Sequence, residues 1–305
     1  MSEPSRMIRI DAGTLRMGST DFYADEGPIH ERFVDAFDID EHPVTNEQFA
    51  RFVEDTGYVT VAERELDPAD FPGADPADLV PGSLVFSPTD GPVDLGDWRQ
   101  WWRWGPGASW RRPFGDGSSI DGLERHPVVQ VSFEDASAYA AWAARRLPTE
   151  AEWEFAARGG LVGARFAWGD DERPGGELQA NHWQGAFPYR NTGAAGWVGT
   201  SPVGTFPANG YGLFDCTGNV WEWTSDYFTP RHNPPSLTAV DAESRPNLLA
   251  ATSAEPGSRI PRRVLKGGSH LCAPEYCLRY RPAARSPQAD DSATTHIGFR
   301  CARSV

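Results

Sequence analysis

Phe214-Asp-Cys-Thr-Gly-Asn-Val-Trp-Glu-Trp223 is the stretch that decides the fold, because it places several oxygen donors in one tight loop. The donors are two carboxylates and two backbone carbonyl groups, from Asp215, Glu222, Gly218 and Val220. Such a loop suits a hard cation such as calcium, which takes roughly six to eight oxygen ligands. The loop ends a long segment, 167–223, that shows almost no helical or strand periodicity. Irregular segments of that length are normally functional or held by something other than regular structure. We therefore expect an irregular fold pinned by metal, and a hydrogen-bonded loop without metal is the alternative.

The composition predicts an ordered chain with little regular secondary structure. The 305 residues include 31 Gly and 26 Pro, a high share, while 12 Trp and 16 Phe argue against disorder. No window of roughly 18 apolar residues occurs, so no membrane-spanning helix or membrane partner is expected. A net charge of −15 without basic patches argues against nucleic-acid binding. We see no linker and no internal repeat, so we expect one domain over 1–305 with a short disordered tail at 1–6.

The four cysteines differ in their spacing. The N-terminus is polar and lacks an apolar signal segment, which predicts a cytoplasmic, reducing location where structural disulfides are disfavoured. In that compartment a close pair such as Cys272 and Cys277 is more often metal-binding or redox-active. A zinc site or a labile disulfide is the alternative, although no nearby Cys-x-x-Cys or His-x₃-His supplies further zinc ligands. Cys216 and Cys301 are interpreted as small buried core residues.

Three segments carry helix signals. Thr45, Ser132 and Thr149 are predicted N-caps, and the last two have an acid three residues on. The predicted helices cover 45–57, 132–146 and 149–160, ending the first at Gly57 and the third at Gly159 or Gly160. Short apolar runs bounded by turn residues predict strands at 7–10, 15–17, 33–39, 128–131, 264–265 and 297–301. The Pro-, Asp- and Ser-rich segments 67–97 and 233–261 are expected to be surface insertions.

Five motifs, in this order, resemble those of the formylglycine-generating enzyme (sulfatase-modifying factor) superfamily. They are Pro148-Thr-Glu-Ala-Glu-Trp153, Asn209-Gly-Tyr-Gly-Leu213, Gly218-Asn-Val-Trp-Glu-Trp223, Lys266-Gly-Gly-Ser269 and Gly298-Phe-Arg-Cys301. The resemblance covers nearly the whole chain. It implies an α+β fold, an irregular variant of the C-type lectin-like fold with little regular secondary structure, stabilised by calcium. The superfamily is broad, so these motifs imply the fold and not the activity.

A sharper resemblance lies in Gly268-Ser-His-Leu-Cys272-Ala-Pro-Glu-Tyr-Cys277-Leu-Arg-Tyr-Arg-Pro-Ala-Ala-Arg285-Ser286. It is similar to the active-site segment of true formylglycine-generating enzymes of the prokaryotic aerobic type. Those copper-dependent oxidases use O₂ to convert the cysteine of a Cys-x-Pro-x-Arg segment, in an unfolded type I sulfatase, to Cα-formylglycine. The resemblance implies the same activity here, an oxidoreductase acting on sulfur with oxygen as acceptor, with Cys272 and Cys277 as Cu(I) ligands. Two thiolates are soft ligands that suit Cu(I) and leave room for a third thiolate from the substrate.

The resemblance also implies roles for residues around the copper. It places Ser269 and Tyr276 beside the copper pocket and makes Trp221 the wall that confines O₂. Large aromatic residues at such spacing are as often core, which is the alternative for Trp221. Arg279 and Arg281 are candidates for orienting the carbonyl groups of a bound peptide, and a solvated or scaffold-paired arginine is the alternative.

The substrate has to present an arginine, which an acidic protein is suited to bind. An aromatic-rich region that could line the substrate groove contains Trp98, Trp101, Trp102, Trp104 and Trp110. Asp116 and Ser118, which follow it, are the candidates for binding the substrate arginine through charge-assisted hydrogen bonds.

Family position implies how calcium would be held. One site would use Asp215, Gly218, Val220 and Glu222. A second would use Asn181 and the carbonyl groups of His182 and Trp197. The family's acidic ligand for this second site falls at Ala195 here, which removes a charge from it.

Two other functions stay open from the sequence. An iron-dependent sulfur oxidase of the same superfamily would need a His-rich iron domain, whereas the seven His here are scattered without a His-x₃-His pair. A non-catalytic lectin-like binding module would have no need for Cys272 and Cys277. Stoichiometric iron would support the first function, and a cysteinyl peptide left unchanged in mass would support the second.

Overall fold

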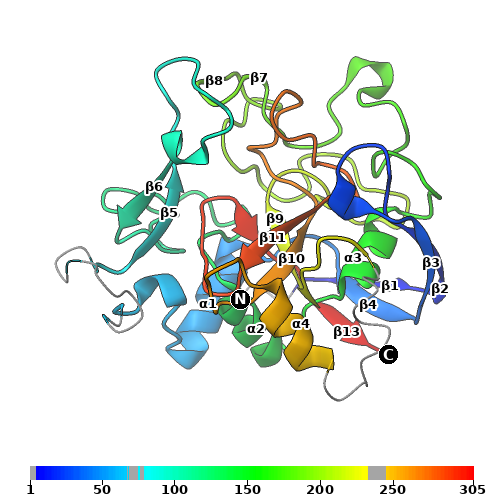
Figure 1. Ribbon diagram of the computed structural model, residues 1–305, viewed down its shortest axis with the longest axis horizontal. Helices are drawn as coiled ribbons and strands as arrows, with labels where there is room; N and C mark the ends of the chain where they lie inside the picture. The colour runs from blue at the N-terminus through cyan, green and yellow to red at the C-terminus, as the bar shows by residue number, and fades with distance from the viewer. Residues whose placement is uncertain (1–4, 67, 69–74, 76–78, 233–244) are drawn as a thin grey trace.

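The computed structural model describes residues 5–66, 68, 75, 79–232 and 245–305. Short strands and short helices are joined by long irregular segments (Figure 1). The strands are β1 (Met7–Ile10), β2 (Gly13–Met17), β3 (His30–Val34), β4 (Phe37–Asp40), β5 (Gly82–Phe86), β6 (Trp102–Pro106), β7 (Gly185–Ala186), β8 (Arg190–Asn191), β9 (Trp221–Tyr227), β10 (Arg262–Lys266), β11 (Arg285–Ala289), β12 (Ile297–Gly298) and β13 (Ala302–Ser304). The α-helices are α1 (Asn46–Thr56), α2 (Phe133–Trp142), α3 (Glu150–Ala157) and α4 (Arg245–Ser253), and the 3₁₀ turns are η1 (Ala24–Glu26), η2 (Val61–Glu63), η5 (Trp98–Gln100) and η6 (Pro174–Gly176).

A four-stranded sheet lies at the centre of the molecule, in the order β11-β10-β9-β12. A second sheet has the order β1-β4-β13, and two-stranded ribbons pair β2 with β3, β5 with β6, and β7 with β8. Figure 1 shows the β5–β6 ribbon on one side of the central sheet and the β2–β3 ribbon on the other. The expected α+β class and its low content of regular structure are confirmed. Segment 167–223 contains only η6, the two-residue strands β7 and β8, and the start of β9.

The three predicted helices are present, and their predicted caps form. The side chains of Thr45, Ser132 and Thr149 each accept a hydrogen bond from the backbone N–H three residues on, in a capping box. Gly57 ends α1 in the left-handed conformation, as predicted. The second helix is shorter than predicted, because Ala144 takes a φ of +54° and turns the chain out of the helix.

Several strand predictions need correction. The predicted strand at 33–39 is divided between β3 and β4, and the predicted strand at 297–301 is reduced to β12. Residues 128–131 form no strand, because Gln130 adopts a φ of +61° and its side chain bonds instead to Ser83 and to the carbonyl of Pro113. The expected insertions 67–97 and 233–261 lie partly outside the described residues, yet the described parts contain β5 and α4.

Of the tail expected to be disordered, 1–6, residues 1–4 lie outside the described residues. Ser5 and Arg6 are ordered, which corrects that part of the expectation. The carbonyl of Ser5 accepts a hydrogen bond from Arg145, and that of Arg6 accepts one from the backbone N–H of Glu41. None of the helices in the described part of the chain is both long and apolar enough to span a membrane.

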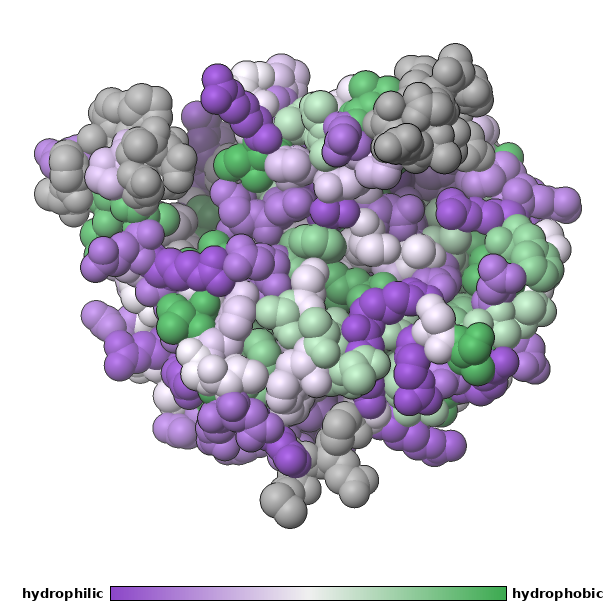
Figure 2. Space-filling model, turned by 90° about the horizontal axis from the view of Figure 1, so that it is seen from below, coloured by the Kyte–Doolittle hydropathy of each residue, from purple (hydrophilic) through white to green (hydrophobic). Residues whose placement is uncertain are grey.

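In the described part of the chain, three clusters of buried side chains form the core, and two of them matter for the site. The larger cluster joins α1 and α2 to the central sheet and contains Cys272 and Cys277. A smaller cluster gathers aromatic residues of the β5–β6 region and of segment 183–187. Figure 2, which views the molecule from the side of α2 and α4, shows small hydrophobic patches separated by hydrophilic side chains.

Candidate functional site

A cavity of about 130 Å³ opens at one end of the central sheet. There β10 ends at Lys266, which pairs with Glu222 near the start of β9 and with Arg285 at the start of β11. At the same end β12 begins, with Ile297 beside Trp221. Chain segments far apart in sequence therefore converge at this end of the sheet. The cavity is lined by Trp101, Trp102, Phe187, Trp221, Ser269, Leu271, Cys272, Tyr276, Cys277, Arg279, Ser286 and His296.

Two glycines shape the loop that carries the cysteines. Gly267 and Gly268 follow β10 directly and have φ values of +93° and +71°, in the left-handed region that side chains disfavour. A Cβ on Gly268 would lie 2.6 Å from the carbonyl oxygen of Arg279. Only glycine therefore allows the backbone at position 268 to approach the backbone at Arg279. This approach brings the turn at Ser269 beside the segment that follows Cys277.

The sulfur atoms of Cys272 and Cys277 lie 3.3 Å apart, and both residues are buried. No disulfide joins them, and the backbone N–H of Ser269 donates to the sulfur of Cys272 at 3.4 Å. Burial raises the pKa of the Cys272 thiol, whereas the hydrogen bond from Cys272 lowers the pKa of Cys277. The two thiols are therefore not equivalent, and the hydrogen bond between them favours ionisation of Cys277 over that of Cys272.

Four of the other residues predicted around the cysteines line the same cavity: Trp221, Ser269, Tyr276 and Arg279. Trp221 is only 5% exposed. The ring of Tyr276 stacks on Phe187 with centroids 4.5 Å apart. Arg279 has no ion pair among the described residues, and its buried Nε has no hydrogen-bond partner. The structure brings these four residues to the cysteines, whereas Arg281 is paired with the buried Glu26 and does not line the cavity. The chemical roles of the four residues remain predictions.

The sequence predicted some of the aromatic residues that line the cavity and missed others. Of the five tryptophans predicted to line a groove, Trp101 and Trp102 line this cavity, whereas Trp110 is fully buried in the core. His296 was not predicted; its Nδ1 lies 2.7 Å from the hydroxyl of Thr294, and its ring lies 4.8 Å from that of Trp102. Phe187 was also missed. No local signal marks these residues, because they come from segments remote from the cysteines.

The structure does not bring Asp116 and Ser118 to this cavity. Asp116 is a largely exposed side chain that forms an ion pair with Arg112 at 3.1 Å. The hydroxyl of Ser118 donates to the carbonyl of Gly115 and accepts from the N–H of Phe114, closing a turn. Their part in binding a substrate arginine stays a prediction.

The loop 215–222 folds tightly, and its carboxylates already have partners. Both oxygens of Glu222 accept hydrogen bonds from Arg300, at 2.7 and 2.8 Å, and one also accepts from Trp153. Asp215 accepts from the backbone N–H of Gly204 at 2.8 Å. Burial raises the pKa of Asp215 to about 6, because this carboxyl has no direct cationic partner among the described residues. Asp215 is therefore the carboxyl of this loop that a bound cation would stabilise.

The residues of the second expected calcium site lie beside that loop. The carbonyl of Asn181 accepts a hydrogen bond from the N–H of Asn219 at 2.8 Å, which joins the two segments. The carbonyl of His182 accepts from Gln184, and that of Trp197 accepts from the N–H of Ala194. Position 195 is alanine, so it adds no carboxylate to these carbonyl groups. Across the described ranges, no three His, Cys, Asp or Glu side chains gather in a way that could hold a metal ion.

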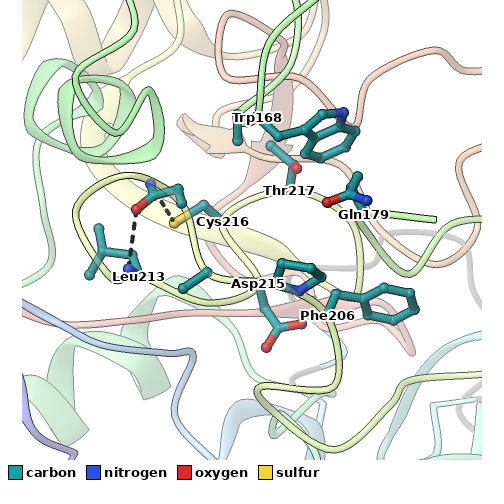
Figure 3. Close-up of a pocket in the computed structure, with 11 residues that line it drawn as sticks. Trp168, Gln179, Phe206, Leu213, Asp215, Cys216 and Thr217 are labelled. Carbon is teal, nitrogen blue, oxygen red and sulfur yellow. Dashed lines mark hydrogen bonds between the residues drawn. The ribbon is translucent and has the colours of Figure 1, made fainter. Parts of the chain in front are cut away.

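A separate small pocket of about 30 Å³ is lined in part by residues 215–217 of this loop (Figure 3). Figure 3 shows the sulfur of Cys216 pointing away from the carboxylate of Asp215. The side-chain amide of Asn209 donates to this sulfur at 3.9 Å. Burial raises the pKa of the Cys216 thiol to about 12, so this residue stays a protonated thiol. Cys301 is fully buried as well. Both residues occupy the core positions expected for them, away from the cavity.

Comparison with known proteins agrees with the motifs. A family model described as "Sulfatase-modifying factor enzyme 1-like domain" matches residues 1–305. The chain is 64% identical over 299 residues to a formylglycine-generating enzyme of Mycobacterium tuberculosis, with 97% of each chain covered. It is also 37% identical to the inactive Cα-formylglycine-generating enzyme 2 of Mus musculus, over 98% of this chain and 86% of that protein. Among solved structures, PvdO from Pseudomonas aeruginosa is similar, with a TM-score of 0.60, 25% identity, and coverage of 99% of this chain and 95% of that one. Similarity thus extends to a relative described as inactive, and activity has to be argued from the site.

Proposed function

Because this chain belongs to the sulfatase-modifying factor family, we propose that it oxidises the cysteine of a Cys-x-Pro-x-Arg segment, in an unfolded type I sulfatase, to Cα-formylglycine, with Cu(I) as cofactor and O₂ as co-substrate. The observation that carries the proposal is the pair Cys272 and Cys277, whose sulfur atoms lie 3.3 Å apart and line one cavity.

The residues of the cavity fit a Cu(I) ion. Two sulfur donors are the soft ligands that Cu(I) prefers, and a site with only two protein ligands leaves a position for the thiolate of a substrate. Across the described residues no third acidic, cysteine or histidine side chain completes a closed metal site here. When bound, copper would supply the one-electron chemistry with O₂ that side chains lack.

The chain's own residues would bind, orient and exclude water. Trp101 and Trp221 are 1% and 5% exposed, so they wall off the cysteines from solvent. The N–H of Ser269 holds the sulfur of Cys272 in place. The free Nε of Arg279 is available to a carbonyl group of a bound peptide, the role that we propose for it. Tyr276, 38% exposed, stands where a peptide would enter.

The overall change in the substrate is an oxidation followed by a hydrolysis. The substrate's Cβ and sulfur lose two hydrogen atoms, whose two electrons and two protons pass to O₂ and give hydrogen peroxide. Water then replaces the sulfur by oxygen and releases it as hydrogen sulfide, so the peptide loses about 18 Da. The net charge of −15 favours capture of the substrate's arginine, for which Asp116 and Ser118 remain the proposed partners.

Calcium is a second, structural proposal. Asp215 and the carbonyl groups of Gly218 and Val220 would hold one ion, with Glu222 sharing it with Arg300. The second set, Asn181, His182 and Trp197, lacks a carboxylate and fits calcium less well. We also propose that the fold is a C-type lectin-like variant in one domain over 1–305. The four unbridged cysteines support a cytoplasmic location.

Mass spectrometry of a peptide reaction tests the function. Metal-stripped protein, with and without one equivalent of Cu(I), is incubated in air with a peptide containing Leu-Cys-x-Pro-x-Arg. We expect a loss of about 18 Da only with copper. Turnover that requires iron instead would support the iron-dependent alternative. Binding without any change in mass would support a non-catalytic module, and either result would overturn the proposal.

A further inference from the structure

An N-terminal segment contacts the loop immediately after the cysteine pair. Tyr23, just before η1, accepts a hydrogen bond on its hydroxyl from the backbone N–H of Leu278 at 3.1 Å. The guanidinium carbon of Arg279 lies 4.1 Å from the centroid of the Tyr23 ring, within the range of a cation–π contact. One side chain therefore contacts both residues that follow Cys277, although it does not line the cavity itself.

A buried ion pair fixes this segment against the loop. Both carboxylate oxygens of Glu26 accept hydrogen bonds from Arg281, and both residues are almost completely buried. The guanidinium of Arg281 also lies 3.8 Å from the centroid of the Phe22 ring and donates to the carbonyl of Leu278 at 2.7 Å. The Glu26–Arg281 pair thus anchors the contact, and Tyr23 is the part of it that reaches toward the cysteines.

We propose that Tyr23 is a positioning residue that holds the Cys277 side of the cysteine pair in its geometry. Cys277 connects on its C-terminal side directly to Leu278, whose N–H would otherwise lack its partner. Arg279, which lines the cavity, is held with its guanidinium over the Tyr23 ring. Both contacts restrict the backbone that sets where the Cys277 sulfur lies relative to Cys272. For turnover, the inference rests on the proposed oxidation, but the geometry of the pair exists without it.

Positioning at this level has measurable consequences. Displacement of a reacting group by about 1 Å can cost on the order of 10²-fold in rate. The Tyr23→Phe substitution keeps the ring under Arg279 and removes only the hydrogen bond to Leu278. The Tyr23→Leu substitution removes both contacts. A residue that merely fills space would change stability alone, whereas a positioning residue changes the relation between the two sulfurs.

The test measures that relation in metal-free protein. Wild type and variants are equilibrated with reduced and oxidised dithiothreitol, so that the two thiols lose two electrons and two protons to the reagent as the disulfide forms. The equilibrium constant reports the effective concentration of one cysteine at the other. We expect it to fall about threefold in Tyr23→Phe and about tenfold or more in Tyr23→Leu, with parallel losses in kcat/KM of the copper-loaded protein.

Tyr58→Phe is the matched control. The Tyr58 hydroxyl donates to Asp135 at 3.1 Å, on the α1–α2 side of the molecule and away from the cavity. The Tyr58→Phe variant should leave the thiol–disulfide equilibrium of Cys272 and Cys277 unchanged, even where it lowers the melting temperature. An unchanged or increased disulfide equilibrium in both Tyr23 variants would overturn the inference. Because this readout needs neither copper nor substrate, its failure is distinct from a failure of the proposed oxidation, which wild-type turnover reports.

Discussion

The cysteine cavity and the loop 215–222 both collect metal-binding atoms, but they treat them differently. In the cavity, the sulfurs of Cys272 and Cys277 contact each other and one backbone N–H, and the cationic side chain that lines the cavity beside them is Arg279. In the loop, Glu222 is already bound by Arg300 and Trp153. The sulfur atoms of the first site are therefore largely available to a metal. At the second site, the carboxylate oxygens of Glu222 already accept hydrogen bonds within the protein. We infer that a metal acts on a substrate at the first, and can only reinforce an existing scaffold at the second.

The largest expected effect comes from removing either sulfur of the cavity. Cys272→Ala or Cys277→Ala should lower the rate of peptide conversion by at least about 10³-fold, because one ligand cannot hold the proposed copper in place. The thermal stability of these variants should change little, since each loses only one sulfur atom. Mass spectrometry of the peptide and thermal unfolding measure the two effects. The control is Cys216→Ala, a buried thiol outside the cavity; a variant of the pair that keeps wild-type turnover would contradict the assignment.

The opposite pattern is expected in the loop. Glu222→Gln leaves Arg300 buried beside a neutral group, and breaking a buried pair in this way costs about 3–5 kcal/mol of folding free energy. Folded protein at low temperature should keep much of its turnover. Denaturant unfolding measures the loss of folding free energy in Glu222→Gln. Glu255→Gln, which removes an exposed partner of Arg262, is the control and should cost at most about 1 kcal/mol. Equal losses in the two variants would show that the loop does not depend on its internal ion pair.

Calcium should add a smaller, pH-dependent stabilisation. Burial raises the pKa of Asp215 from 3.8 to about 6, so without calcium the folded state favours the protonated carboxyl. The stabilisation of the folded state that results from this raised pKa is complete below pH 3.8 and is lost as the pH rises through about 6. Calcium binds the ionised form, so the stability difference between calcium and chelator should grow over the same range. At a hundredfold excess over Kd it should reach about 2.7 kcal/mol. Thermal unfolding between pH 4 and about 7 in both buffers measures it. A difference independent of pH would exclude Asp215 as a ligand.

The smallest effect is expected outside both regions. Asp116 is an exposed side chain paired with Arg112, away from the cysteine cavity. As the proposed partner of the substrate arginine, Asp116 would act from an exposed position, so Asp116→Asn should lower kcat/KM for a Cys-x-Pro-x-Arg peptide by only about twofold, the size typical of an exposed ion pair. Peptides with Arg or Lys at the last position provide the comparison. A tenfold loss confined to the Arg peptide would instead extend the substrate groove to this turn.

Local signals in the sequence predicted local structure well. The capping residues Thr45, Ser132 and Thr149 each begin a helix where predicted, because a cap is decided by residues three positions apart. The strand predicted at 128–131 was wrong, because the side chain of Gln130 finds tertiary partners that outweigh the β propensity of the valines around it. α4 was missed because its sequence carries no strong helical face.

The site shows the same division between local and remote information. Cys272 and Cys277, with Ser269 and Tyr276, lie in one short segment, so motif reasoning could bring them together. Trp101 and His296 reach the same cavity only through the packing of the β5–β6 region and the start of β12 against that segment. Aromatic density near residue 101 was a usable signal, whereas a single histidine before β12 was not. The contact of Tyr23 with Leu278 spans 255 residues and needed the fold itself.

A copper titration tests the central claim most directly. Metal-free protein receives increasing amounts of Cu(I), and the fraction of a Leu-Cys-x-Pro-x-Arg peptide that loses about 18 Da in air is followed by mass spectrometry. If the pair Cys272 and Cys277 forms the proposed site, conversion should be absent at the start, rise in proportion to copper, and level off at one ion per chain. Conversion that is independent of copper, or that persists at full rate when both cysteines are replaced by alanine, would contradict the account.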